Sequence, residues 1–163
     1  MAYNQGQYKT SYLTALTDFK STDVEGIGTL RWQAGKKYKW VKLHTGTSAT
    51  VASVVNGAVG FLATDTALTT VCTDVTDCIA GLAAGVTLVA AITDLYYCWI
   101  QIGGISGALS VNATGTTPAV GDAVSLSATD NAFKVDPPIT DLKAGVLTDV
   151  TGSANLVYLT CPE

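Results

Sequence analysis

The chain is short of the residue types that soluble domains usually place on their surfaces. Only 13% of its 163 residues are charged, and a single histidine is present, His44. That charged fraction lies well below the ~25% typical of soluble domains. Because few charges are available to solvate the exterior, we infer that much of the surface contacts another protein chain.

Residues suited to catalysis are equally sparse. The sequence has no nucleophile elbow, P-loop, GxGxxG or HExxH motif. A Ser–His–Asp arrangement would have to use His44, which stands beside a TGTS loop and is expected to face solvent. The acids are scattered singly in turns, where Asp caps backbone N–H groups. We therefore expect no enzymatic activity, no cofactor and no small-molecule substrate.

No metal-ligand pattern is present. The four cysteines form no CxxC pair, and a structural zinc site needs four Cys or His ligands in recognisable spacing. Asp74 and Asp77 lack the repeated oxygen spacing of a calcium loop. Cys98 is expected to be a small core residue. Cys72 and Cys78 bracket TDVTD and would bridge a loop in an oxidising compartment, although free thiols are the expectation for this chain.

Long apolar runs are also missing. The start, MAYNQGQYK, is polar and lacks the apolar region of a cleaved signal. The longest apolar run, residues 79–92, is interrupted by glycines and is much shorter than the ~20 residues that span a bilayer. The sequence predicts neither a cleaved signal nor a membrane contact.

Charge is divided unevenly along the chain. Residues 1–43 hold seven basic and three acidic residues, a net charge of +4, whereas residues 44–163 hold two basic and ten acidic residues, a net charge of −8. A basic front on an acidic body suits docking to an acidic partner surface. Lysines that discourage pairing of edge strands are the alternative. Nucleic-acid binding is not expected, because the positive charge is modest and no binding signature accompanies it.

What the chain has in quantity is short strands bounded by turns. LYYCWIQIGG at 95–104 and AVGDAVSL at 119–126 are typical examples. Hairpins are predicted over 30–43, 50–63 and 146–160, and a further strand over 86–92. Both faces of YYCWIQI are apolar, which predicts a central strand. The spacing predicts an all-β fold, a small antiparallel β-barrel or sandwich.

The first 26 residues differ from the rest. Residues 1–26 are predicted to form a loosely structured N-terminal arm, and residues 27–163 a β-rich domain. The aromatic residues of the arm, among them Tyr8, Tyr12 and Phe19, are too apolar for a free tail. We expect the arm to lie on its own domain or on a neighbouring subunit.

Three tryptophans stand in alternating strands: Trp32, Trp40 and Trp99. Aromatic faces stack on sugars, but core or interface packing is the commoner use of a tryptophan in such a strand. Packing is the preferred interpretation.

Several segments carry a family resemblance. EGIGTLRW…GKKYKWVKL, NGAVGF, AAGVTLVAAITDLYYCWIQIGG, AVGDAVSL and AGVLTDVTGSANLVYL resemble capsid decoration, or cement, proteins of tailed bacteriophages. The resemblance covers residues 24–160 and rests mainly on the YY-x-WIQI-GG and GD-x-V pair. It implies a β-rich homotrimer on the outer capsid that clamps neighbouring major capsid subunits against internal DNA pressure. The location implied is the virion, after synthesis in the host cytoplasm. The aromatic arm, Cys72 and Cys78 lie outside this pattern.

The implied partners are the major capsid protein and further copies of the chain. We expect capsid contacts from the arm and the basic hairpin, and subunit contacts from strand aromatics. The capsid-contact candidates are Tyr8, Tyr12, Phe19, Arg31, Lys36, Lys37, Lys39 and Lys42. The subunit-interface candidates are Trp32, Trp40, Tyr97 and Trp99.

Two other classes stay open. One is a tail or fibre-base protein that binds a host-surface glycan, which an exposed Trp32 or Trp99 would favour. The other is a cell-encoded β-rich enzyme or ligand-binding barrel, which a deep pocket lined by Asp and Tyr would favour.

Overall fold

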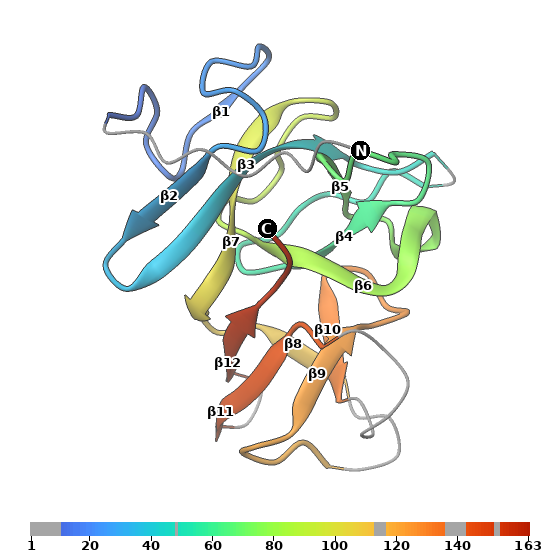
Figure 1. Ribbon diagram of the computed structural model, residues 1–163. Coiled ribbons are helices and arrows are strands. Elements are labelled where there is room, and N and C mark those ends of the chain that lie inside the picture. Colours follow the sequence, from blue (N-terminus) through green and yellow to red (C-terminus); the bar gives the residue numbers. More distant parts are fainter. Residues whose placement is uncertain (1–10, 48, 113–116, 136–142, 152–153) are drawn as a thin grey trace.

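The fold is all-β, as the sequence predicts. A computed structural model describes residues 11–47, 49–112, 117–135, 143–151 and 154–163 (Figure 1). These residues form one mixed sheet of twelve strands and a single 3-10 turn, η1 (Val75–Asp77). The strands are β1 (Phe19–Lys20), β2 (Leu30–Gln33), β3 (Lys36–His44), β4 (Ala58–Leu62), β5 (Thr70–Cys72), β6 (Cys78–Thr87), β7 (Tyr97–Ile105), β8 (Ser110–Asn112), β9 (Ala123–Leu126), β10 (Ala132–Val135), β11 (Gly145–Thr151) and β12 (Ala154–Thr160).

The sheet folds back on itself like a sandwich and does not make a clean barrel. Strands β3, β5, β4, β6 and β7 pair in that order, and β7 pairs again with β3. Strands β12, β11, β9, β10 and β8 follow, and a bridge from Leu109 to Asn155 links the start of β8 to β12. These two groups lie one above the other in Figure 1, joined where β12 pairs with β7. The β3–β5 and β8–β10 pairs are parallel, which corrects the expectation of a purely antiparallel fold.

Two predicted hairpins are confirmed. β2 and β3 pair antiparallel around Ala34 and Gly35, which both have positive φ, at 51° and 75°. That conformation matches the twist of the flanking strands. β11 and β12 form the C-terminal hairpin.

The hairpin predicted over 50–63 is wrong. Residues 50–57 form no strand, and the Asn56 N–H donates instead to the carbonyl of Thr87, the last residue of β6, at 2.8 Å. The strand predicted over 86–92 lies earlier, over Cys78–Thr87, because the chain accommodates glycine within β6 at Gly81 (φ 70°).

β7 is central and covered on both faces, as predicted. Cys98, Ile100 and Ile102 point into the main core, whereas Trp99 points into a second, aromatic cluster on the other face. Fully burying a large apolar side chain stabilises the fold by about 1.5–3 kcal/mol. β7 therefore ties two apolar layers to one strand. Among the described residues, no helix is long and apolar enough to cross a membrane.

Candidate interaction surfaces

A buried carboxylate holds residues 11–26 together, and a hydrogen bond from Trp99 on β7 ties them to the sheet. Glu25 Oε1 accepts hydrogen bonds from Leu13 N and Thr14 N, both at 2.8 Å, and from Thr14 Oγ1 at 2.7 Å. Trp99 Nε1 donates to Thr14 Oγ1 at 2.9 Å. The described part of the arm is therefore held by its own domain, which is one of the two locations that the sequence left open.

The arm covers an aromatic cluster. The Tyr12 ring meets the Trp99 ring edge-on at 5.6 Å, Trp40 meets Trp99 at 5.2 Å, and Tyr97 stacks on Trp40 at 6.5 Å. Trp40 and Trp99 are fully buried. Since the chain itself encloses both side chains, they have no surface to offer a second subunit, and the expectation of an interface role is corrected for these two. Trp32 is 56% exposed, and Tyr97 is half-buried.

Arg31 is also engaged within the chain. Its guanidinium lies 4.7 Å from the Tyr12 ring centroid and 5.8 Å from that of Trp99. It donates to the Thr14 carbonyl at 3.0 Å and to Gln33 Oε1 at 2.6 Å. This cation–π arrangement fastens the arm to β2 and leaves little of the guanidinium for a partner.

Lys39 is buried, so a capsid contact through its ammonium is corrected. Nζ donates to the Leu68 carbonyl at 3.5 Å and lies 5.4 Å from the Phe61 ring centroid. Desolvation lowers the pKa of the Lys39 amine, and the nearby Asp65 carboxylate opposes that shift.

The other hairpin lysines are half-buried and spread over separate contacts. Lys37 forms an ion pair with Glu163, and its Nζ lies 5.8 Å from the Trp32 ring. Lys42 Nζ lies 5.8 Å from the Tyr97 ring. Lys36 is half-buried beside the hairpin turn. The basic residues of the hairpin therefore do not gather into one open patch.

Apolar side chains of the arm do reach the surface. Leu13 is 76% exposed, and Phe19 is exposed beside Tyr96, with ring centroids 6.2 Å apart. Leu95, next to Tyr96 in sequence, is exposed as well. We call Leu13, Phe19 and Leu95 the arm surface. Tyr8 lies outside the described residues.

The acids shape turns. Asp65 accepts backbone N–H groups from Ala67, Thr69 and Thr70 at 2.6–2.9 Å. Burial raises the pKa of Asp65, but these hydrogen bonds outweigh it and hold the pKa at about 2. His44 is half-buried and not solvent-facing, since its Nδ1 accepts from Gly46 N at 2.8 Å. Within the described ranges, no group of three or more His, Cys, Asp or Glu is placed to hold a metal ion.

All four cysteines are free and buried, in line with the expectation of thiols. Cys78 Sγ lies 3.5 Å from the Cys72 carbonyl and 3.4 Å from the Asp74 carbonyl. Burial raises the pKa of Cys98 and of Cys161 to about 12. Neither of those two thiols is poised as a nucleophile, because the thiolate is the reactive form.

Sequence reasoning missed an exposed apolar row on the C-terminal strands. Ile105 on β7 pairs with Tyr158 on β12, which pairs with Val146 on β11. These side chains are 48%, 50% and 43% exposed. The sequence signal that could reveal this row is the alternation of outward Val146 with buried Leu147. Because the outward residues are themselves apolar, the sequence does not show which face of the strand is exposed.

No family model and no curated protein matches the chain.

Proposed function

We propose that the chain is a structural virion protein that binds the outer surface of a phage capsid as a homotrimer and cements neighbouring major capsid subunits. The observation that carries the proposal is the arm surface, where large apolar side chains are held outward on a well-packed all-β body. The low charged fraction of 13% and the resemblance to decoration proteins support it.

The packing of the arm suits an adhesive role. The hydrogen bonds from residues 13 and 14 to Glu25 hold Leu13 in place before any partner arrives. Preorganisation removes part of the ordering cost of binding. Each apolar contact then adds ~25 cal/mol per Å² before association costs, and many copies on one lattice add avidity.

The basic residues make a smaller contribution than the sequence predicts. Arg31 and Lys39 are committed to contacts within the chain, and Lys37 pairs with Glu163. Apolar contact by Phe19 and Leu13 is the proposed mode of capsid binding. Lys36 stays a candidate for an additional contact.

The test is co-sedimentation with expanded heads of tailed phages, followed by heat challenge of the heads. Leu13→Ser together with Phe19→Ser should lower head binding at least about tenfold, as truncation of central apolar anchors does. Val120→Ser, which removes an exposed apolar side chain from a turn outside the arm, serves as the control and should bind normally. The proposal is contradicted if the protein does not co-sediment with any phage heads, or if it turns over a substrate.

A second candidate is a tail or fibre-base protein that binds a host-surface glycan. The exposed Trp32 indole favours it, because sugars stack on aromatic faces. Glycan-array binding that Trp32→Ala abolishes, without any binding to heads, would establish this function in place of capsid cementing.

A further inference from the structure

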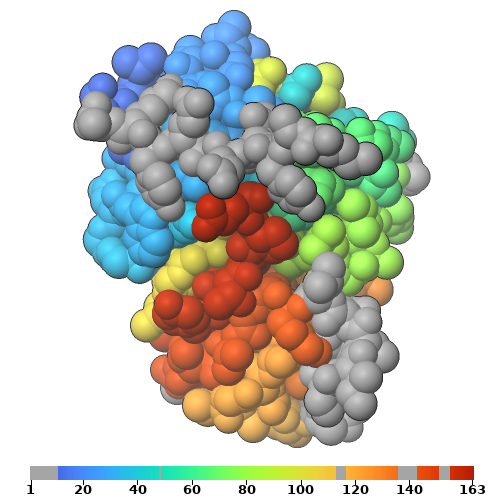
Figure 2. All heavy atoms as spheres, in the orientation of Figure 1, coloured from blue at the N-terminus to red at the C-terminus, as the bar shows by residue number. Residues whose placement is uncertain are grey.

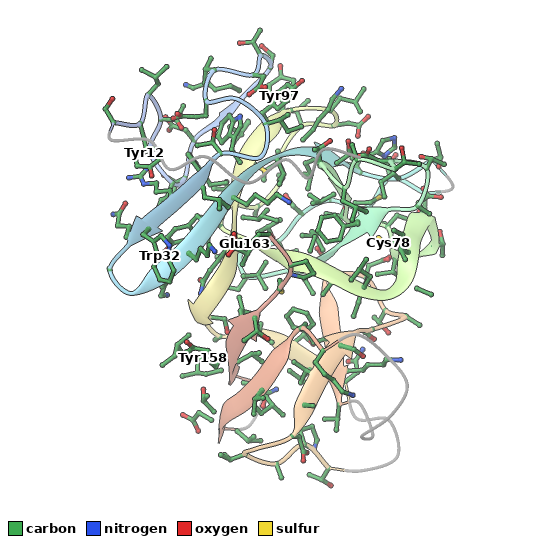
Figure 3. The ribbon with its side chains drawn as sticks, viewed as in Figure 1. Tyr12, Trp32, Cys78, Tyr97, Tyr158 and Glu163 are labelled. Carbon is green, nitrogen blue, oxygen red and sulfur yellow. The ribbon has the colours of Figure 1, made fainter. Side chains whose placement is uncertain are left out.

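Two of the four buried cysteines lie next to each other although they stand on different strands. Cys72 is the last residue of β5 and Cys78 is the first residue of β6, with η1 between them. Cys78 Sγ lies 3.5 Å from the Cys72 carbonyl oxygen. Figure 3 shows Cys78 beside β4, and Figure 2 shows the green segments of this region packed together at one side of the molecule. The fold therefore brings together a pair that the sequence alone only spaces.

A glycine leaves the space in which the two side chains meet. Gly60 on β4 pairs with Cys72 across the antiparallel β4–β5 ladder. Residues paired in this way point their side chains to the same face of the sheet, with Cβ positions about 4.5–5.5 Å apart. A Cβ at Gly60 would lie 2.7 Å from Cys78 Sγ and 2.8 Å from Cys78 Cβ. The Cys78 side chain therefore occupies the place beside Cys72 that a larger residue at position 60 would fill.

The two thiols interact directly. A hydrogen bond between the two side chains lowers the pKa of the Cys72 thiol, and burial opposes that shift. The same hydrogen bond raises the pKa of the Cys78 thiol, and burial adds to the rise. The pair therefore loses its first proton from Cys72. The thiolate is the form of cysteine that reacts with oxidants.

The connecting turn already holds the ends of the pair together. Asp74 Oδ1 accepts from the Thr76 N–H at 2.9 Å, and the Asp74 carbonyl accepts from the Asp77 N–H at 3.2 Å. The Cys78 N–H donates to the Val75 carbonyl. Because the fold fixes this turn before any covalent bond forms, closing the pair requires little further ordering of the chain.

We propose that Cys72 and Cys78 are the site of an oxidative modification, in which hydrogen peroxide converts the two thiols into a disulfide that staples β5 to β6. The Cys72 thiolate attacks one peroxide oxygen, the O–O bond breaks, and hydroxide leaves and takes up the proton that Cys72 released. The sulfur of Cys78 then attacks the sulfenic sulfur of Cys72, so that the S–S bond forms and the S–O bond breaks. The departing oxygen leaves as water with the Cys78 proton. The peroxide accepts two electrons, and the products are one disulfide and two water molecules.

Burial of the pair sets how the reaction proceeds. Cys72 is completely covered and Cys78 is 8% exposed. The peroxide therefore enters when residues 73–77 open locally, and the new bond then holds them closed. This turn contacts distant segments, since the Val75 N–H donates to Asp130 Oδ1 at 2.9 Å and the Thr47 N–H donates to Asp77 Oδ2 at 2.6 Å. A cross-link here restricts the unfolded chain, so oxidation should raise the midpoint of thermal unfolding by about 5 °C.

The first test is thiol counting by mass spectrometry on the full chain. The folded protein is treated with excess hydrogen peroxide, the peroxide is removed, and the chain is unfolded in N-ethylmaleimide. The untreated protein should take up four labels, one for each free cysteine, and the oxidised protein two. Cleavage of the oxidised chain at Asp74 or Asp77 should leave two peptides that remain joined until a reductant separates them.

Single substitutions distinguish this pair from general oxidation of thiols. Cys78→Ala removes the second sulfur, so the sulfenic acid at Cys72 should persist and be trapped by dimedone on unfolding. Its unfolding midpoint should not rise on peroxide treatment. Cys98→Ala and Cys161→Ala are the matched controls, because each removes a buried thiol and keeps the pair. Both should still form the bond and show the rise of about 5 °C.

Three outcomes overturn the inference. One is retention of four labels after a peroxide treatment that oxidises the unfolded chain. Another is a disulfide that maps to any other pair of cysteines. The third is an unfolding midpoint that rises equally in Cys78→Ala. The inference does not rest on the capsid proposal, because neither cysteine belongs to the arm surface, and head binding is measured separately.

Discussion

The side chain of Glu25 stabilises the arm through several hydrogen bonds to one oxygen atom. Its Oε1 atom accepts from two backbone N–H groups and one hydroxyl, and the carboxylate is buried. Glu25→Ala leaves these donors without their acceptor, and we expect the free energy of unfolding to fall by about 3 kcal/mol. Urea denaturation followed by tryptophan fluorescence measures it, because Trp99 donates to Thr14 in the same network.

The matched control for this substitution is Glu25→Gln. The amide keeps one acceptor oxygen for the Leu13 and Thr14 donors, but it removes the charge and replaces the other oxygen by an NH2 group. We expect a smaller loss of about 1 kcal/mol. Equal losses in the two variants would show that the oxygen's hydrogen bonds do not hold the arm.

Lys39 is a residue whose burial costs stability at neutral pH. Its side chain is 6% exposed, and desolvation lowers the pKa of its amine below 10.5. Because the folded state holds the proton less tightly than the unfolded state, the cost is full below the folded pKa. It shrinks as the pH rises through that value towards 10.5. Lys39→Met should therefore stabilise the protein by about 1 kcal/mol at pH 7.

The pH dependence is the decisive part of that prediction. Thermal unfolding at pH 7 and at successively higher pH should show the advantage of Lys39→Met narrowing as the lysine loses its proton. An advantage independent of pH would mean that improved packing, and not charge burial, is the cause.

At the scale of elements, Gly145 allows β11 and β12 to approach closely, because it has no side chain. A Cβ at this position would lie 2.2 Å from the Tyr158 carbonyl oxygen and 2.8 Å from Val157 Cγ1. The first of these is backbone and cannot rotate away. Gly145→Ala should lower the free energy of unfolding by at least about 2 kcal/mol, as overpacking does.

Gly28→Ala provides the comparison. Gly28 has φ 85° and open space where a Cβ would stand, so only backbone strain of about 1–2 kcal/mol is expected. A loss at Gly145 no larger than the loss at Gly28 would contradict the steric argument.

The same scale shows which elements are predictable from the sequence. The β2–β3 hairpin is predictable because Ala34 and Gly35 form a local turn between alternating strands, and central β7 because both of its faces are apolar. The exact extent of β6 is not predictable from the sequence. Gly81 locally disfavours a regular strand, but the pairing of β6 with β4 overrides that preference.

The candidate site residues show the same limit, because residue type can be interpreted locally but the surroundings of a side chain cannot. Residue type predicts that Trp40 and Trp99 pack, but not that the arm encloses them. Lys39 is read from the sequence as a surface base, yet its strand turns it inward beside Phe61. Whether a side chain faces the core or a partner depends on strand register and on the path of the arm, and those contacts are distant in sequence.

At the scale of the whole molecule, β7 belongs to both groups of strands. It pairs with β3 and β6 in one group and with β12 in the other. The main core spans both, since it contains Cys98 of β7 and Cys161 just after β12. The backbone of Cys161 is also tied to β7, because its N–H donates to the Ile102 carbonyl at 3.0 Å. These shared contacts predict that the two groups unfold as one cooperative unit.

Thiol labelling tests that cooperativity. Burial and a pKa of about 12 protect Cys98 and Cys161 in the folded state, so alkylation at pH 8 requires opening. In variants that retain only one of these two cysteines, labelling should be slowed at least about 10³-fold relative to the unfolded chain. The two rates should rise together with urea, with the slope of global unfolding. Faster labelling of Cys161 than of Cys98 would mean that the C-terminal strands open independently, because local opening exposes one thiol while the other stays enclosed.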